Sequence, residues 1–210
     1  MSIRLHRGDL TDLSRYSAEQ TPFVAIDTET LGLNPHRDRL CVVQLSPGDG
    51  TADIVQIPAG AGRYDAPNLE KLLVDPNITK LFHFARFDVA ILGKTFGITV
   101  APVWCTKIAS RLTRTYTDRH GLKDLTRELL GIDLSKQQQS SDWAAEELTD
   151  AQLNYAASDV LHLHALQAKL AAMLAREKRA ELAGACFRFL PTRAQLDLAG
   201  WPEEDIFAHS

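Results

Sequence analysis

The sequence predicts a mixed α/β fold in which helices flank a central mixed sheet that contains an antiparallel meander. Three observations support this class. β-rich runs lie within residues 23–33, 40–46 and 52–57, with turn residues between them. Strand and helix patterns then alternate along residues 68–130. An alanine-rich helical segment follows from Thr149.

Length and composition predict a single domain spanning residues 1–210. The chain has 210 residues, of which 45% are hydrophobic, which is enough for one sizeable core and short for two. It contains no apolar run of about 18 residues, and its first residues are mixed and polar rather than a charged-then-apolar leader. We therefore expect a protein that neither enters a membrane nor is exported.

Cysteine spacing indicates the cellular compartment, and net charge limits the kinds of binding partner that are expected. Cys41, Cys105 and Cys186 are widely separated, which is typical of a reducing cytoplasm rather than of a disulfide framework. The net charge of -4 argues against a protein that holds long nucleic acid through a broad basic surface. A short polyanion, or one bridged by metal ions, is compatible with this charge.

The first third of the chain reads as strands. Residues 3–7 predict a short edge strand before Pro22 and the central strand. After the loop at Asn34-Pro35, strands are expected at residues 40–46 and 52–57, separated by Pro47-Gly48-Asp49-Gly50. Together with the central strand, these two strands predict an antiparallel meander of three strands.

Helices and one more strand follow. The elements expected next are a helix at residues 68–73, a strand at 78–83, a helix at 87–96 stopped by Gly97, a helix at 104–112, a helix at 122–130 ended by Gly131, and a polar loop at 132–143.

Thr149 and Gln152 form a capping-box sequence, so a long helix is expected from there to about Ala175. A final helix and an irregular tail, residues 201–210, complete the chain. Trp201, Ile206 and Phe207 make the tail apolar, which predicts docking onto the core or onto a neighbouring subunit. The alternative is a frayed terminus.

Two acids stand together on the central strand. Strand side chains alternate, so Asp27 and Glu29 point to the same face. Neighbouring carboxylates on an otherwise apolar strand repel each other, and a bound divalent cation removes that cost. The pair therefore predicts a metal site; the alternative is a strand end where two acids reach water.

Two more acids and a tyrosine extend this set. Asp88 stands where a strand leads into a helix, a position that also suits an acid facing the helix dipole. Asp159 falls on the apolar stripe of the long helix, so a charge points inward. Tyr155 lies one turn earlier on the same face. The alternative is an acid at the edge of the stripe beside a core tyrosine.

Taken in order, three motifs resemble the DEDD superfamily of 3′-to-5′ exonucleases, in the tyrosine-bearing branch that includes ribonuclease D and the proofreading domains of DNA polymerases. The motifs are Asp27-Thr28-Glu29, Phe87-Asp88 and Tyr155-x-x-x-Asp159. Ribonuclease D-like proteins usually have Asn where this chain has Phe84, which removes any substrate contact carried by that amide.

The stretch after Asp159 is short for the helical nucleic-acid-binding domains that ribonuclease D adds, so we expect a stand-alone member. The nanoRNase C (NrnC) group is the subgroup that the chain most resembles, and the segments that carry this similarity are residues 105–110, 115–123, 135–143 and 205–210.

The resemblance implies a ribonuclease H-like fold and a 3′-to-5′ exoribonuclease that degrades very short RNA, down to dinucleotides, to nucleoside 5′-monophosphates. It implies that Asp27 bridges two divalent ions, that Glu29 and Asp159 complete the site holding the nucleophilic water, and that Asp88 holds the second ion. Tyr155 would position the water. Hard oxygen ligands suit Mg²⁺ or Mn²⁺. NrnC proteins form ring-shaped octamers, so a homo-oligomer is expected.

Further residues are candidates for binding substrate. Thr28 belongs to the first motif, and the resemblance suggests that Leu33 wedges against bases, although ordinary loop packing is the alternative. His83 stands at a strand end near the acids. A basic cluster could hold a 5′-phosphate, and the alternative is a solvated mixed face. The cluster comprises Lys107, Arg111, Arg114, Arg119, His120, Lys123 and Arg127, of which Arg114, Arg119, His120 and Lys123 are the chosen candidates.

Two other functions remain open on the sequence. One is an exonuclease that acts on DNA or on longer structured RNA, because the cleavage chemistry does not read the 2′-hydroxyl. The other is a catalytically silent nucleic-acid-binding domain that keeps the fold, although all four acids and Tyr155 are present.

Overall fold

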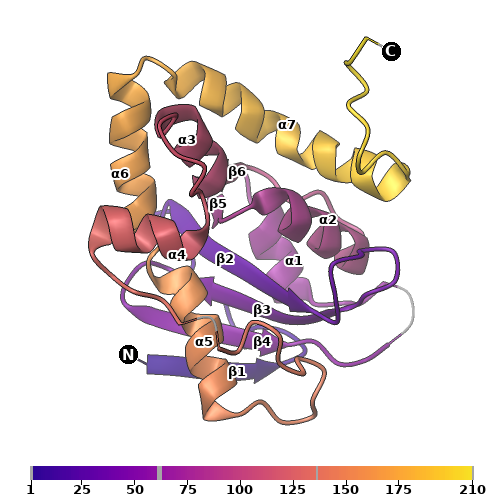
Figure 1. The fold of residues 1–210 in the computed structure, drawn as a ribbon. Coiled ribbons are helices and arrows are strands. Elements are labelled where there is room, and N and C mark those ends of the chain that lie inside the picture. The colour runs from indigo at the N-terminus through magenta and orange to yellow at the C-terminus, as the bar shows by residue number, and fades with distance from the viewer. Residues whose placement is uncertain (1, 61–62, 136, 210) are drawn as a thin grey trace.

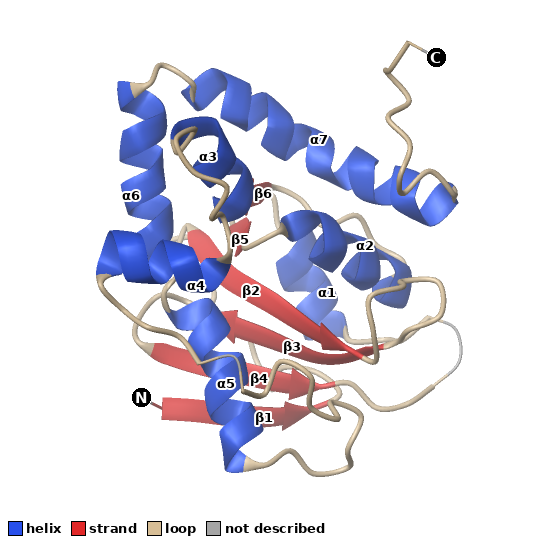
Figure 2. Ribbon diagram, in the orientation of Figure 1, coloured by secondary structure: helices blue, strands red, loops and turns tan. Residues whose placement is uncertain are grey.

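A mixed β-sheet forms the centre of the molecule in the computed structural model, which describes residues 2–60, 63–135 and 137–209 (Figures 1 and 2). Within these residues the strand order is β1-β4-β3-β2-β5-β6. The strands are β1 (Ser2–Arg7), β2 (Phe23–Thr30), β3 (Leu40–Ser46), β4 (Thr51–Gln56), β5 (Thr79–Phe82) and β6 (Val103–Cys105).

The predicted meander is confirmed. β2 pairs antiparallel with β3, and β3 pairs antiparallel with β4. The turn between β3 and β4 places Gly48 and Gly50 at positive φ, a conformation that glycine adopts without a steric cost. β1 and β5 add on in parallel to β4 and β2, so the mixed α/β class is confirmed as well.

Helices cover the sheet and extend beyond it. They are α1 (Pro67–Val74), α2 (Ala85–Phe96), α3 (Thr106–Thr113), α4 (Leu122–Leu125), α5 (Asp150–Leu161), α6 (Leu163–Arg176) and α7 (Ala180–Ala199), with a π-helical turn at Thr126–Leu130. α5 lies across the face of β1 to β4, while α7 packs on α2 and β6 (Figure 1). No helix in the described ranges has both the length and the apolar character needed to cross a membrane.

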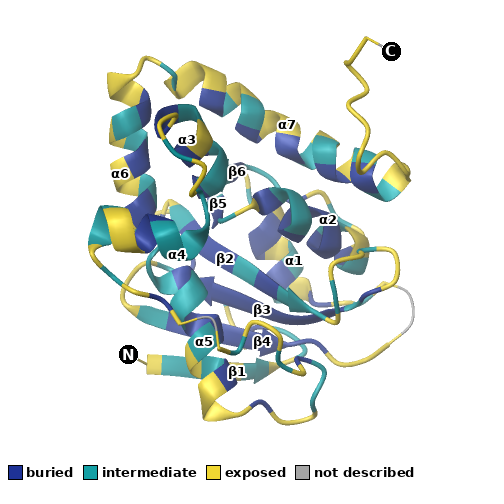
Figure 3. Ribbon diagram, in the orientation of Figure 1, coloured by how far each residue is buried: buried dark blue, intermediate teal, exposed yellow. Residues whose placement is uncertain are grey.

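The core is continuous between the sheet and its helices. Every residue of β3 is buried, because this strand has neighbours on both edges and α5 on one face (Figure 3). The buried residues of α6 are Leu163, Leu166, Leu170 and Leu174, the three-to-four spacing predicted for its apolar stripe.

One predicted helix starts later than expected. Residues 104–112 were expected to be helical, but Val103–Cys105 forms the edge strand β6 and the helix begins at Thr106. Val103 and Cys105 are buried in this strand, and Trp104 on its other face packs on Phe187 with ring centroids 5.0 Å apart. Pairing with β5 therefore overrides the local helical pattern.

The long helix predicted from Thr149 is interrupted. The capping box is present, since Gln152 N donates to Thr149 Oγ1 and Thr149 N donates to Gln152 Oε1. His162, with φ -102 and ψ -5, separates α5 from α6. The predicted helix at residues 122–130 is also divided, into α4 and the π-helical turn. The predicted loop at 132–143 has no helix or strand among its described residues, and residue 136 lies outside them.

The C-terminal tail leaves the body of the molecule (Figure 1). Asp197 near the end of α7 accepts hydrogen bonds from Arg86 at 2.6 and 2.7 Å and from Arg193 at 2.7 Å. Beyond this clamp Phe207 is 76% exposed, and its ring centroid lies 6.0 Å from that of Phe189. Docking of the tail into the chain's own core is therefore not observed. Docking on a neighbouring subunit stays a prediction. Ser210, the last residue of the tail, lies outside the described residues.

One buried carboxylate joins the N-terminal strand to the sheet. Asp53 on β4 accepts hydrogen bonds from Arg4 at 2.7 and 2.8 Å, from Arg15 at 2.8 Å and from Tyr16. The His6 ring nitrogen Nε2 lies 2.8 Å from the same carboxylate. The Asp53 side chain is only 3% exposed, so these partners have replaced water around its charge.

We expect Asp53→Asn to lower the free energy of unfolding by about 3 kcal/mol, because two arginines would lose the negative charge that they share. The matched control is Asp49→Asn, since Asp49 also pairs with Arg15 but its side chain is 51% exposed. That variant should lose less than about 1 kcal/mol. Urea denaturation measures both, and equal losses would show that burial of Asp53 is not the cause.

Candidate active site

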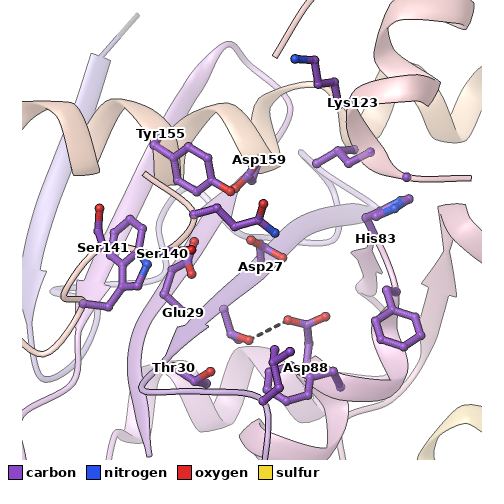
Figure 4. Close-up of a pocket in the computed structure, with 18 of the residues that line it drawn as sticks. Asp27, Glu29, Thr30, His83, Asp88, Lys123, Ser140, Ser141, Tyr155 and Asp159 are labelled. Carbon is purple, nitrogen blue, oxygen red and sulfur yellow. Dashed lines mark hydrogen bonds between the residues drawn. The ribbon is translucent and has the colours of Figure 1, made fainter. Parts of the chain in front are cut away.

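Four acids from three elements converge at one end of the sheet (Figure 4). β2 carries Asp27 and Glu29, the first turn of α2 carries Asp88, and α5 carries Asp159. Carboxylate oxygens of Asp27, Glu29 and Asp159 lie within 4.8 Å of one another. The structure therefore brings together residues that are far apart along the chain.

Each acid is placed by a local feature of the sequence. Asp27 and Glu29 share a face of β2, which lies between β3 and β5. Asp88 is in the first turn of α2, where its Oδ1 accepts a hydrogen bond of 2.7 Å from Thr28 Oγ1. The capping box begins α5, and the contacts of this helix with β2 and β3 place Asp159 over the strand acids.

Burial raises the pKa of Asp27, Glu29 and Asp88, and repulsion by neighbouring carboxylates adds to the rise for Asp27 and Glu29. Burial raises the pKa of Asp27 well above its ordinary value, and the charges of Asp88, Asp159 and Glu29 add to the rise. Burial and the charges of Asp159 and Asp88 raise the pKa of Glu29 to about 9. Burial raises the pKa of Asp88 to about 7, against the lowering effect of the Thr28 hydrogen bond. The cluster therefore requires protons or a positive charge to be stable.

A divalent cation fits this cluster. All four donors are carboxylates, the hard oxygen ligands that Mg²⁺ and Mn²⁺ prefer. A buried amide also lies next to one of these acids. Gln44 Oε1 on β3 has no hydrogen-bond partner in the part of the chain that the structure describes, while Gln44 Nε2 lies 3.5 Å from Glu29 Oε1. The Gln44 amide therefore contacts the acid cluster through Glu29, while its buried oxygen is left without a partner among the described residues.

Gln44 was missed by the sequence reasoning. Its Cα pairs with that of Asp27 across the β2–β3 ladder, so both side chains belong to the same face of the sheet. The available signal was a polar amide inside the otherwise apolar run at residues 40–46.

Tyr155 lies over the acids. Its hydroxyl points toward Asp159 (Figure 4), and its ring packs on Trp143 with centroids 5.9 Å apart. Burial, followed by the charges of Asp159, Glu29 and Asp27, raises the pKa of the Tyr155 phenol above its ordinary value. The hydroxyl therefore stays protonated at neutral pH.

A cavity of about 820 Å³ opens above the four acids. Four predicted substrate-binding residues line it: Thr28, Leu33, His83 and Lys123. Leu33 is 85% exposed, so it stands free on the loop after β2 rather than packing into the core. Lys107 of the predicted basic cluster also lines the cavity, and lining residues that were not predicted to bind substrate include Phe84, Ser140, Ser141 and Trp143.

Arg114, Arg119 and His120 are not among the residues that line this cavity. Arg114 is fully buried, pairs with Glu128, and donates to Ser110 Oγ at 3.0 Å and to the Arg119 carbonyl at 2.6 Å. His120 Nδ1 lies 2.8 Å from the same Ser110 hydroxyl. These contacts hold the segment after α3 together, and they do not favour the predicted phosphate contact by Arg114.

Phe84 occupies the turn between β5 and α2. It adopts a left-handed conformation with φ 66, unusual for a residue with a side chain, and its ring is 46% exposed. Lys107 Nζ lies 4.1 Å from the centre of the ring. Position 84 therefore offers an aromatic face, with a cation close to it, to the cavity.

The metal-free protein should lose stability as the pH rises from about 5 to about 9. An acid whose pKa is raised on folding binds more protons when folded, so the unfolding free energy falls as pH rises between its two pKa values. This window runs from 3.8 to about 7 for Asp88 and from 4.5 to about 9 for Glu29.

Thermal melts in a chelator across this range measure the effect. Asp27→Asn should give a flatter dependence because one of the repelling charges is gone. Identical pH dependences for the two proteins would contradict the proposed repulsion.

Comparisons with known proteins agree with this geometry. A family model described as 3′-5′ exonuclease matches residues 8–175. A protein named ribonuclease D from Acidiphilium cryptum is 38% identical over 165 residues, which cover 79% of this chain and 41% of that relative. The chain thus spans about two fifths of the length of the ribonuclease D relatives it matches.

Two solved structures of Brucella melitensis NrnC match the whole fold. The one with bound Mg²⁺ has a TM-score of 0.94 and 64% sequence identity, and covers 100% of both chains. The one bound to pGG has a TM-score of 0.95 and 65% identity, with the same coverage. The ribonuclease H-like fold is confirmed by these neighbours.

The matched family is one of nucleases that need divalent metals, in keeping with the clustered acids. The resemblance drawn from the three motifs is confirmed: the chain belongs to the family of 3′-5′ exonucleases, and it is similar to ribonuclease D and to NrnC.

Proposed function

We propose that this protein is a metal-dependent 3′-to-5′ exoribonuclease that degrades short oligoribonucleotides, dinucleotides included, to nucleoside 5′-monophosphates. The observation that carries the proposal is the convergence of Asp27, Glu29 and Asp159 within 4.8 Å at the floor of an open cavity. Asp88, buried and joined to Thr28, supplies a fourth carboxylate next to them.

Asp27, Glu29, Asp88 and Asp159 would hold two divalent ions, Mg²⁺ or Mn²⁺. When bound, such ions neutralise charge on the phosphate and make water a better nucleophile. The raised pKa values of Asp27, Glu29 and Asp88 fit this role, because these carboxylates ionise fully at neutral pH only beside a cation.

The chain's own groups orient the reactants. Tyr155 keeps its proton, so its hydroxyl serves to position the attacking water by a hydrogen bond rather than to remove a proton. Packing on Trp143 limits the directions in which the Tyr155 ring can point. Thr28 fixes the Asp88 carboxylate through its 2.7 Å hydrogen bond.

The cavity walls suit a short polyanion. Lys107 and Lys123 bring positive charge to the rim, and Leu33 provides an exposed apolar side chain for contact with a base. The Brucella protein binds pGG, which supports short RNA as the ligand class. The net charge of -4 is in keeping with a substrate held by a few local contacts.

We propose further that the protein acts in the cytoplasm as a homo-oligomer with octameric rings as the expected form. Free cysteines at positions 41, 105 and 186 support a reducing compartment. The exposed apolar side chains of Phe189, Ile206 and Phe207 support a subunit contact through the tail. Light scattering of the purified chain tests the assembly, and a monomer would refute it.

A product ladder tests the substrate and the direction of cleavage. RNAs of two to seven nucleotides with a 5′ label, and matched DNAs, are incubated with Mg²⁺ or Mn²⁺. Stepwise shortening from the 3′ end, with the dinucleotide consumed fastest, is the expected result. Equal rates on DNA or on longer RNA would favour the broader exonuclease. Absence of turnover with either metal would favour a silent nucleic-acid-binding domain.

A further inference from the structure

His83 is one of the side chains that line the active-site cavity. It follows the last residue of β5 and lines the cavity, across from Tyr155 (Figure 4). Its Nδ1 lies 2.8 Å from Thr106 Oγ1 at the start of α3. No hydrogen bond to Nε2 is found within the described ranges, so this nitrogen is the part of the ring left for a ligand.

The hydrogen-bond chain behind the ring determines which nitrogen carries the proton. Thr106 Oγ1 donates its only hydrogen to the Phe82 carbonyl at 3.2 Å, because a carbonyl oxygen can only accept. Both contacts of Thr106 Oγ1 are hydrogen bonds only when this oxygen accepts from His83, so this arrangement places the hydrogen on Nδ1. In the neutral ring Nε2 is left as an acceptor.

The ring is neutral at physiological pH. Burial, with a further contribution from the nearby Lys107 charge, lowers the pKa of His83 to about 3. An unprotonated Nε2 cannot donate a hydrogen bond to a phosphate oxygen, and it would repel one through its lone pair. His83 therefore requires a ligand group that donates.

We propose that His83 Nε2 accepts a hydrogen bond from a ribose 2′-hydroxyl, and so makes this site prefer RNA over DNA. The inference rests on the proposed exonuclease function and names the substrate group that His83 would contact. Nucleic acids carry two kinds of donor, sugar hydroxyls and base N–H groups. Sugar hydroxyls are donors whatever the base, and the 2′-hydroxyl, unlike the terminal 3′-hydroxyl, is also present at every internal ribonucleotide. The His83 ring lines the same cavity as the acids.

Matched dinucleotides isolate this contact. Each substrate is the diribonucleotide or the same molecule with one 2′-hydroxyl replaced by hydrogen, tested for two different base sequences. The wild-type protein should cleave the all-ribo form about tenfold faster than one of the deoxy forms, the loss typical of an unmade hydrogen bond. His83→Phe keeps a planar ring without an acceptor, so its ribo rate should fall about tenfold while its rate on that deoxy form stays unchanged.

The hydrogen bonds of Thr106 with His83 and Phe82 suggest a second pair of variants and a measurement other than activity. Thr106→Val removes the hydroxyl with little change of shape, and Thr106→Ser restores it. Nitrogen-15 NMR of the His83 ring should show the proton on Nδ1 in the wild-type protein and in Thr106→Ser, and a mixture of tautomers in Thr106→Val. Ribo preference should follow the same order.

The outcomes separate this inference from the function on which it rests. Equal cleavage of ribo and deoxy substrates by the wild-type protein, or equal losses on both in His83→Phe, would overturn the role of His83 and leave the exonuclease in place. A loss that follows the base rather than the sugar would overturn it as well. No cleavage of any substrate by the wild-type protein would overturn both.

Discussion

Asp27→Asn should lower the rate of phosphodiester cleavage by more than about 10³-fold, with no loss of fold. Asparagine keeps the size of the side chain but removes a charge that interacts with those of Asp88, Asp159 and Glu29. After burial, the charges of all three other acids raise the pKa of Asp27. Its loss should therefore weaken cation binding more than it disturbs packing.

The measurement is single-turnover cleavage of a labelled diribonucleotide, with both proteins at the Mn²⁺ concentration that saturates the wild-type protein. Asp133→Asn, an exposed acid in the loop after the π-helical turn, makes the same chemical change outside the cavity and should keep the wild-type rate. Cleavage by Asp27→Asn at a rate comparable to wild type would remove this residue from the chemistry.

Tyr155→Phe should lower kcat by about 10²-fold and leave KM and metal affinity nearly unchanged. The variant removes only the hydroxyl that points toward Asp159, while the ring can still pack on Trp143. Because the phenol stays protonated, the lost function is orientation of the attacking water rather than proton removal. The pH at which the rate rises should therefore be the same in both proteins.

Tyr116→Phe is the matched control, because it removes a phenol whose hydroxyl donates to Glu128 at 2.7 Å outside the cavity. It should keep the wild-type kcat. A shift of the pH profile in Tyr155→Phe would instead identify the phenol as a base, and an unchanged kcat would exclude it from the mechanism.

Local patterns predicted most of the fold because they coincide with the tertiary structure. The turn residues between positions 47 and 50 join two strands that are paired as expected. The Thr149 and Gln152 pair begins α5 in the form the sequence indicates. Trp104 is where the local pattern failed, since a helical periodicity cannot report that a strand edge is available for pairing.

The acids could be selected from sequence because a charge on an apolar face conflicts with burial unless something neutralises it. Their convergence within 4.8 Å could not be derived from spacing alone, since it depends on how α5 crosses the sheet. The prediction for Arg114 failed for another reason. A pattern of basic residues in the sequence does not show whether an arginine is accessible to a phosphate or, like Arg114, is buried and paired with Glu128. Gln44 was not predicted as a site residue because a single uncharged amide in a strand does not conflict with burial as a carboxylate does.

Titration of Mn²⁺ into the metal-free protein, followed by calorimetry, tests most directly whether the four acids form a cation site. The account predicts that the wild-type chain binds two ions and gains thermal stability as they bind. Asp27→Asn should lose this binding, and Asp133→Asn should retain it. Equal Mn²⁺ binding by the wild-type protein and Asp27→Asn, or none by the wild-type protein, would contradict it.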